Sequence, residues 1–178
     1  MVTQRPMMYE PREDSYLLQK YVRQFAHGRV LDVGTGSGIQ AKTALEKTNE
    51  VIAIDIDPEA VAHAKKQGIR AIISDLFEQV EGTFDLIIFN APYLPAMKGE
   101  QPEIARQVAG GKKGNEIIER FLKDASAYLK PQGKILLVCS SLTPDFESLC
   151  KKYKWKQKLL EEEACFFEKL LVYLIEKH

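Results

Sequence analysis

The sequence predicts an α/β protein built on a doubly wound, mostly parallel sheet with an antiparallel strand pair at its C-terminal edge. Short apolar runs alternate with amphipathic segments along most of the 178 residues, which is the pattern of strands connected by helices. Near the C-terminus two apolar runs follow one another with only a short turn between them, which indicates an antiparallel pair. The length suits a single domain that spans residues 1–178.

The first helix is expected to begin at a cap provided by Asp14 or Ser15 and to end near Ala26, because apolar residues recur on one face between these points. Further along the chain, Pro58 suits the first position of a helix at 59–67, and Gly68 ends that helix. The first half of the chain is therefore expected to hold, after the first helix, strand 29–33, helix 39–47, strand 50–54, helix 59–67 and strands 69–73 and 84–89.

The second half opens with a connection at 91–113 that is long for a compact domain, and such loops are usually functional. A helix at 115–129 is expected to stop before Pro131 and Gly133. The last expected elements are strand 134–139, helix 144–153, and strands 155–160 and 166–175, which are joined around "EEEAC".

Composition and charge narrow the classes of function. Lys+Arg and Asp+Glu both number 25, so no global attraction to nucleic acid or to anionic membrane is expected. The N-terminal residues contain no apolar core of a secretory signal, and no stretch is apolar enough to span a bilayer, so a cytoplasmic location is expected. Cys139, Cys150 and Cys165 are widely spaced and form no zinc pattern, so reduced thiols and no metal are expected.

The segment "VLDVGTGSG", Val30 to Gly38, carries an apolar strand into a loop with Gly34, Gly36 and Gly38. These glycines let the backbone turn sharply and approach a ligand closely. Their spacing is GxGxG, which differs from the GxGxxG of dinucleotide folds. Asp32 precedes the loop, where a carboxylate suits a cationic amino group and would repel a pyrophosphate.

Acidic residues also follow the next two strands. Asp55 ends the second strand, where a carboxylate can accept hydrogen bonds from both ribose hydroxyls. Asp75 ends the third strand and can accept from an exocyclic adenine amine, with Leu76 and Phe77 offering apolar contact. Each acid alone is equally a turn residue or a helix cap. Together, at the ends of consecutive strands beside a glycine loop, they predict a nucleoside site.

This set resembles the class I S-adenosylmethionine-dependent methyltransferases. The resemblance implies a Rossmann-like fold with strand order 3-2-1-4-5-7-6 and S-adenosyl-L-methionine as cofactor. It also implies that Asp32 engages the methionine part of the cofactor, Asp55 the ribose and Asp75 the adenine. An NAD-type oxidoreductase is the competing interpretation from the fold alone, and the glycine spacing disfavours it.

The fourth strand ends in "NAPY", which resembles the [N/D]PPY motif of amino-methyltransferases, with Ala91 in place of the first proline. An amide nitrogen is a poor nucleophile because its lone pair is delocalised. The side-chain oxygen of Asn90 and the carbonyl of Ala91 can accept hydrogen bonds from such a nitrogen and stabilise the charge that develops on it. Pro92 biases Ala91 toward an extended conformation, and Tyr93 can stack on a planar group. An ordinary turn is the alternative for these residues.

Two further segments narrow the family. "YEPREDSYLL" resembles the N-terminal segment of HemK-related methyltransferases, which implies that Ser15 contacts the cofactor. "AGGKKGNEIIERFL" resembles the GG-x-x-G segment of the same family. The resemblance is to the short archaeal and eukaryotic branch of that family, and it implies N5-methylation of the GGQ glutamine in a class I translation release factor. Members of this branch commonly work with a small zinc-binding activator subunit. Strand 69–73, as the edge of the sheet, could pair with such a subunit through Ile72 and Ile73.

Two other functions compete with this one. A nucleic-acid amino-methyltransferase would use the same chemistry, and "KKYKWKQK" at 151–158 could contact phosphates and stack bases through Tyr153 and Trp155. The same segment also fits an amphipathic edge strand with its aromatic residues packed inward and its lysines solvated, which is the favoured interpretation. A non-catalytic cofactor-binding partner is the other alternative, and the "NAPY" segment argues against it.

Overall fold

The computed structural model describes residues 10–93, 114–165 and 167–178. The helices are α1 (Glu13–Phe25), α2 (Ile39–Ala44), α3 (Pro58–Lys66), α5 (Glu116–Tyr128) and α6 (Phe146–Lys152). The strands are β1 (Arg29–Val33), β2 (Glu50–Asp55), β3 (Ala71–Ile73), β4 (Phe84–Asn90), β5 (Leu129–Ser140), β6 (Trp155–Cys165) and β7 (Glu168–Lys177).

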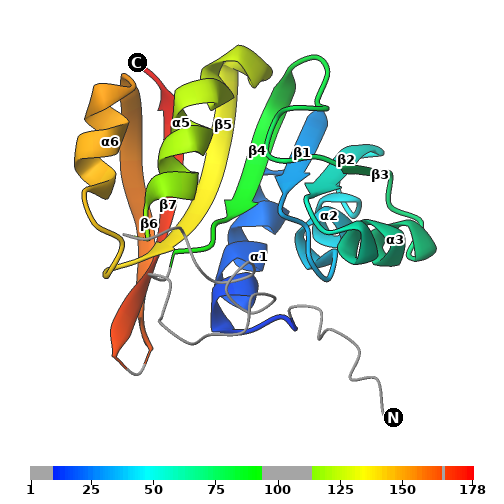
Figure 1. The fold of residues 1–178 in the computed structure, drawn as a ribbon, viewed down its shortest axis with the longest axis horizontal. Helices are drawn as coiled ribbons and strands as arrows, with labels where there is room; N and C mark the ends of the chain where they lie inside the picture. The colour runs from blue at the N-terminus through cyan, green and yellow to red at the C-terminus, as the bar shows by residue number, and fades with distance from the viewer. Residues whose placement is uncertain (1–9, 94–113, 166) are drawn as a thin grey trace.

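The strands form one seven-stranded sheet with the order β3-β2-β1-β4-β5-β7-β6 (Figure 1). The strands β1 to β5 pair in parallel, whereas β7 runs antiparallel to both β5 and β6. This arrangement confirms the predicted fold class and strand order. No helix in the described ranges is long and apolar enough to cross a membrane.

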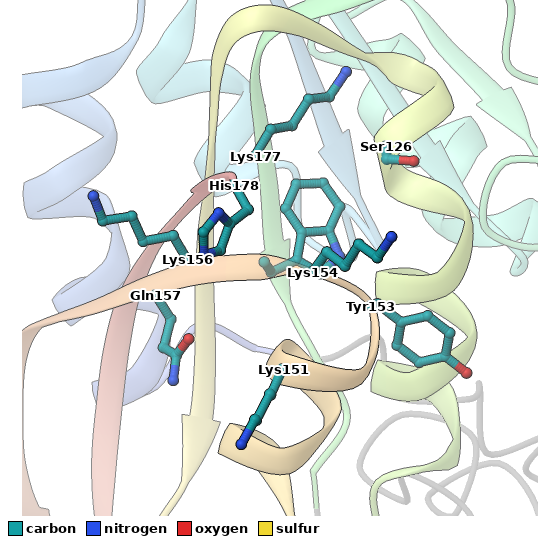
Figure 2. A pocket seen from close by; sticks show the side chains of 9 residues that line it. Ser126, Lys151, Tyr153, Lys154, Lys156, Gln157, Lys177 and His178 are labelled. Carbon is teal, nitrogen blue, oxygen red and sulfur yellow. The ribbon is translucent and has the colours of Figure 1, made fainter.

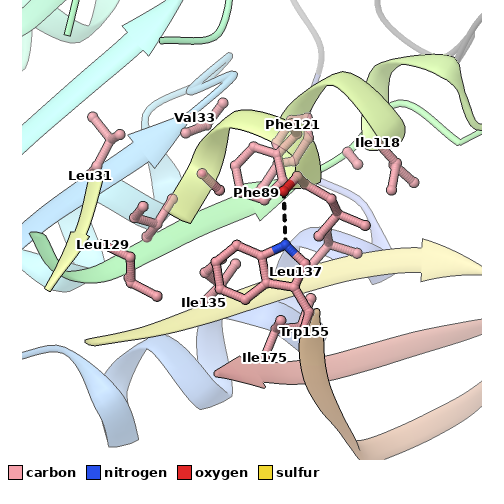
Figure 3. Packing of buried hydrophobic residues seen from close by; sticks show 14 of the residues in the cluster. Leu31, Val33, Phe89, Ile118, Phe121, Leu129, Ile135, Leu137, Trp155 and Ile175 are labelled. Carbon is pink, nitrogen blue, oxygen red and sulfur yellow. Dashed lines mark hydrogen bonds between the residues drawn. The ribbon is translucent and has the colours of Figure 1, made fainter. Parts of the chain in front are cut away.

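Helices cover both faces of the sheet, because residues that alternate along the strands are apolar on both sides. On one face, the buried Leu18 of α1 packs with helices α2 and α3 against alternate strand residues such as Ile88. On the other face, Phe121 of α5 lies against Phe89 of β4, with ring centroids 4.6 Å apart (Figure 3). The indole Nε1 of Trp155 donates to the carbonyl of Leu122 at 2.8 Å, so the polar atom of this buried side chain is satisfied.

The start of α1 differs from the prediction. Its N-cap is Arg12, so neither Asp14 nor Ser15 caps the helix. Both lie inside the first turn with their side chains buried, 5% and 2% exposed. The prediction was wrong because both residues lie past the N-cap, where their side chains reach the end of β4: Asn90 Nδ2 is 3.2 Å from Asp14 Oδ2 and 3.4 Å from Ser15 Oγ.

Two strands after α5, β5 and β6, are longer than predicted, whereas α6 is shorter than the predicted helix 144–153. No loop follows the helix, since β5 begins directly at Leu129, and Pro131 and Gly133 lie within this strand. A Cβ on Gly133 would come within 2.8 Å of the Phe84 carbonyl, which explains why glycine stands where β5 passes β4. The "EEEAC" segment is also part of a strand, since β6 pairs with β7 as far as Cys165.

Candidate active site

The carboxyl ends of β1 to β4 place the predicted polar residues along one edge of the sheet. In the parallel register Asp32 pairs with Ala53, so Asp55 lies just beyond it on the neighbouring strand. Asn90 is the last residue of β4, and Asp75 follows the end of β3. Parallel sheets bind ligands at this edge. The structure therefore brings the predicted acids and the strand-end amide to one side of the molecule.

The glycine loop lies in front of this edge. Gly34, Gly36 and Gly38 have φ of 65°, 50° and 82°, a region that side chains rarely adopt. Within the described ranges a Cβ on Gly34 would meet only the Phe89 ring, at 3.8 Å, so these residues leave the space above this backbone open. The backbone N–H of Gly36 donates to Asp55 Oδ2 at 2.9 Å, which fixes the loop against β2.

The buried side chain of Asp32 forms hydrogen bonds that stabilise the glycine loop. Its Oδ2 accepts hydrogen bonds from Thr35 Oγ1 at 2.6 Å and from the backbone N–H of Ala41 at 3.1 Å. The side chain is 1% exposed, and burial raises the pKa of Asp32 to about 7. The predicted contact between Asp32 and a cationic amino group stays a prediction, because the atoms seen here serve the loop and α2.

Asp55 is half-buried and accepts two backbone hydrogen bonds, one from Gly36 and one from Asp57 N at 2.9 Å. Burial raises the pKa of this carboxyl group. The next side chain, Ile56, is 60% exposed at the same edge. Sequence reasoning missed Ile56, although an apolar residue directly after a strand-end acid in "IDID" was a signal for one face of a planar ligand.

Asp75 forms an ion pair with Arg120 of α5, with 2.9 Å between Oδ2 and the guanidinium nitrogen. This partner was also missed, because nothing in the sequence relates residues 45 positions apart. Leu76 is half-buried at a φ of 50°. The prediction that Phe77 offers apolar contact to a ligand was wrong. Its ring is buried in the core and stacks on Tyr128 with centroids 4.5 Å apart.

Asn90 carries an orphaned polar atom. Its Oδ1 is buried and has no hydrogen-bond partner among the described residues. Its Nδ2 lies 3.2 Å from Asp14 Oδ2 and 3.4 Å from Ser15 Oγ. A buried acceptor without a partner is costly and is rare in native proteins, so its presence at a strand end indicates a place for a ligand donor. Beside it Tyr93 is half-buried, and its hydroxyl lies 3.4 Å from Asp14 Oδ2.

Comparison with known proteins identifies the family. Residues 13–166 match the sequence profile of the Methyltransferase small domain family. The chain belongs to this family. Within it, a candidate protein N5-glutamine methyltransferase of Methanocaldococcus jannaschii is 36% identical, over 94% of this chain and 90% of its own. A release factor glutamine methyltransferase of Koribacter versatilis is 32% identical, over 74% of this chain and 55% of its own.

A solved structure supports the fold assignment. The E. cuniculi Mtq2–Trm112 complex, which is responsible for methylation of the translation termination factor eRF1, matches with a TM-score of 0.78 at 24% identity. The match covers 96% of this chain and 99% of that chain. This likeness shows that the chain has the methyltransferase fold over nearly all of its length.

Some predicted parts of the methyltransferase site lie outside the described ranges. These are Tyr9, the connection over residues 94–113 and its glycine segment at 109–113. The "NAPY" residues lie within the described ranges, with Ala91 2% exposed and Pro92 half-buried. The backbone carbonyl of Ala91 therefore starts from a fixed position beside Asn90.

The lysine-rich segment lies at the opposite edge of the methyltransferase sheet, where β6 begins and β7 ends (Figure 2). It lines an open hollow of about 850 Å³. Trp155 is 4% exposed and cannot stack on a base, and the Tyr153 hydroxyl donates to Glu119 at 3.1 Å. The ammonium groups of the labelled lysines point in different directions. The amphipathic interpretation is therefore confirmed for Trp155.

The cysteines of the methyltransferase are free thiols, and no cluster of acidic, Cys or His residues in the described ranges could hold a metal. Burial raises the pKa of Cys139 and of Cys150 to about 12, so both remain protonated at neutral pH. These two side chains belong to the core and not to the chemistry.

Proposed function

We propose that this protein is a protein-glutamine N5-methyltransferase that transfers a methyl group from S-adenosylmethionine to the GGQ glutamine of a class I translation release factor. The single observation that carries the proposal is the buried, unpartnered Oδ1 of Asn90 at the end of β4. An acceptor in that place suits an N–H donor, and the primary amide of glutamine is such a donor. Relatives named as glutamine methyltransferases support this choice.

The residues at the sheet edge fit S-adenosylmethionine. The open backbone at Gly34 permits close approach of a ligand. Asp55 offers carboxylate oxygens that can accept from hydroxyl groups, and the exposed Ile56 offers an apolar surface next to them. The proposed set that holds the cofactor is Ser15, Asp32, Gly34, Gly36, Gly38, Asp55, Asp75, Leu76 and Asn90. When bound, the cofactor supplies a methyl group on a sulfonium centre, which is a strong leaving group.

The chain contributes orientation and electrostatic stabilisation. Asn90 Oδ1 and the Ala91 carbonyl are proposed to accept the two N–H groups of the target amide, which directs its nitrogen lone pair at the methyl group. Both acceptors interact more strongly as the nitrogen becomes positive, so they favour the transition state over the ground state. Pro92 biases the preceding Ala91 toward an extended backbone, and the half-buried ring of Tyr93 is proposed to stack on the planar amide.

The surface around this edge favours a protein substrate over a nucleic acid. Leu142 follows β5 and Phe167 precedes β7 at the carboxyl end of the sheet, and they are 52% and 95% exposed. Tyr16, next to Ser15 in α1, is 58% exposed. Exposed apolar side chains around one site suit a protein surface. The lysines that could contact phosphates lie at the other edge, so the nucleic-acid alternative is not favoured.

The free edge of β3 suggests a partner. β3 is the outermost strand, and Ile73 at its end is 50% exposed. We propose that a small zinc-binding activator subunit adds a strand to this edge and forms a heterodimer, as unpaired strand edges commonly accept partners. The E. cuniculi neighbour is itself a complex of Mtq2 with Trm112. The proposal also includes a single methyltransferase domain over residues 1–178 and a cytoplasmic location, where release factors act.

Methyl transfer to mixed substrates tests the proposed function. The protein, with and without its activator, is incubated with labelled S-adenosylmethionine and equal amounts of a release factor, tRNA and DNA. We expect the label only in the release factor, and peptide mass spectrometry should place it on the GGQ glutamine. Label in tRNA or DNA, or on another residue of the release factor, would contradict the proposal.

A further inference from the structure

The carboxylate of Asp14 lies directly behind the Asn90 amide. Asp14 Oδ2 is 3.2 Å from Asn90 Nδ2 and 3.4 Å from the Tyr93 hydroxyl. Asp14 is 5% exposed, so water does not compete strongly for these contacts. The same side chain thus touches both polar groups of the "NAPY" segment from one side.

The contact between Asp14 and Asn90 decides which end of the Asn90 carboxamide faces the target nitrogen. A carboxylate can only accept hydrogen bonds, so the NH₂ group of Asn90 must be the end that points at Asp14. Ser15 Oγ, 3.4 Å from the same nitrogen, can also accept. The Oδ1 atom is then directed away from Asp14, and it is this atom that has no hydrogen-bond partner in the described part of the chain.

We propose that Asp14 is a positioning residue that fixes the orientation of the Asn90 carboxamide, so that an acceptor and not a donor meets the target nitrogen. This inference rests on the proposed function of Asn90. Without Asp14 the amide could turn about its last side-chain bond, because its two ends have nearly the same size. A turned amide would present NH₂ to the N–H groups of the substrate.

Asp14 is itself held in one orientation. Its Oδ1 accepts hydrogen bonds from the backbone N–H of Ser15 at 2.6 Å and from Ser15 Oγ at 3.2 Å. Gln40 of α2 donates from Nε2 to the Ser15 carbonyl at 2.8 Å, which ties this turn of α1 to the helix after the glycine loop. One carboxylate oxygen of Asp14 therefore accepts hydrogen bonds from Ser15 in the helix, and the other contacts the Asn90 amide.

This division predicts an unusual order of mutational effects. In Asp14→Asn the new side chain keeps its shape, and its oxygen must stay with the backbone N–H of Ser15. Its NH₂ group then faces Asn90 and favours the turned amide. Asp14→Ala removes the carboxylate and leaves Asn90 free to adopt either orientation. The isosteric variant is therefore expected to be slower than the truncated one, whereas a residue with a merely structural role shows the reverse order.

Single-turnover methyl transfer to the release factor, with KM and cofactor affinity measured in parallel, tests the inference. We expect Asp14→Asn to lower kcat roughly 10²-fold, by analogy with other preorganised contacts in active sites. We expect Asp14→Ala to lower it about 10-fold, with little change in KM or in cofactor affinity. Glu13→Gln is the matched control, since it makes the same chemical change at an exposed neighbour and should keep the full rate.

A second variant in the same assay separates this inference from the proposed function. If Asn90→Ala is slow, then adding Asp14→Asn to it should slow it no further, because Asp14 acts through Asn90. A multiplicative loss in the double variant would overturn the inference, and so would an Asp14→Asn protein faster than Asp14→Ala. An Asn90→Ala protein that keeps its rate would instead overturn the proposed function.

Discussion

At the scale of single residues, Asp32 links the glycine loop to the stability of the fold. Its pKa is raised from 3.8 to about 7, chiefly by burial. Between these two values the folded chain holds a proton on Asp32 that the unfolded chain releases, so rising pH favours unfolding through this group. The stabilising effect of that proton is complete at low pH and is lost as the pH rises through the folded pKa.

We therefore expect Asp32→Asn, which cannot ionise, to gain stability relative to the unmodified protein as the pH rises from about 4 to about 7. Urea unfolding without cofactor, repeated across this pH range, measures the difference. An Asp57→Asn protein controls for loss of another carboxylate at the same edge of the sheet. If the difference in unfolding free energy between the Asp32 variant and the unmodified protein stays constant with pH, then Asp32 is ionised in the folded chain.

Asp55 is expected to contribute to cofactor affinity. Asp55→Ala removes charged acceptors worth on the order of 1.5–3 kcal/mol each and also releases the N–H of Gly36. Calorimetry with S-adenosylmethionine or its demethylated product should show affinity reduced by more than about 10-fold. Asp57→Ala is the control, since Asp57 caps α3 through Glu59 N and its loss should affect stability alone. Unchanged affinity in Asp55→Ala would mean that the ribose assignment is wrong.

At the scale of elements, the hairpin of β6 and β7 turns on the side of the sheet where β5 ends. Phe167 at its tip is 95% exposed, which suits the proposed contact with a protein substrate. We expect Phe167→Ser to raise KM for the release factor several-fold and to leave kcat and cofactor affinity unchanged. Leu159→Ser, at an exposed apolar position in the middle of β6, should change none of these values. A KM equal to that of the unmodified protein would remove the hairpin tip from the substrate surface.

The elements also show what a sequence can predict. β1, the glycine loop and β4 could be predicted because apolar runs and turn residues are local signals. The strand-end position of Asn90 followed from them. The ends of β5 and β6 could not be predicted. Leu129 pairs with Phe84 ahead of an irregularity that contains Pro131, and pairing with β7 carries "EEEAC" into the sheet. The contact of Asp14 with Asn90 spans 76 residues and depends on how α1 packs on the sheet, which no local pattern contains.

At the scale of the whole molecule, different edges of the sheet carry different surface features. The carboxyl ends of the strands carry the proposed methyltransferase site, the opposite ends carry the lysine-lined hollow, and β3 and β6 are the two lateral edges. β6 carries lysines and a register shift between Leu159 and Glu161, features that discourage further strand pairing. β3 has fewer features that discourage strand pairing, and the proposed activator is therefore assigned to that side.

Co-expression with the activator subunit, followed by size-exclusion chromatography, tests this assignment. We expect a heterodimer, and we expect Ile73→Glu to abolish it, because a charge at this half-exposed position would be buried by an added strand. Leu159→Glu on the opposite lateral edge should leave the complex intact. A monomer that is stable and fully active on a release factor without any partner would refute the heterodimer.

The central claim is that the strand-end amide of Asn90 holds the target nitrogen, and its most direct test is single-turnover methyl transfer by Asn90→Ala. We expect Asn90→Ala to methylate the GGQ-bearing release factor at a rate roughly 10²–10³-fold lower than that of the unmodified protein. Cofactor affinity should fall much less than the rate, although Asn90 also belongs to the proposed cofactor set, because the lost Oδ1 interaction is with the target nitrogen and strengthens as that nitrogen becomes positive. A variant that transfers methyl groups at the full rate would contradict the account, since Asn90 would then be only a turn residue at the end of β4.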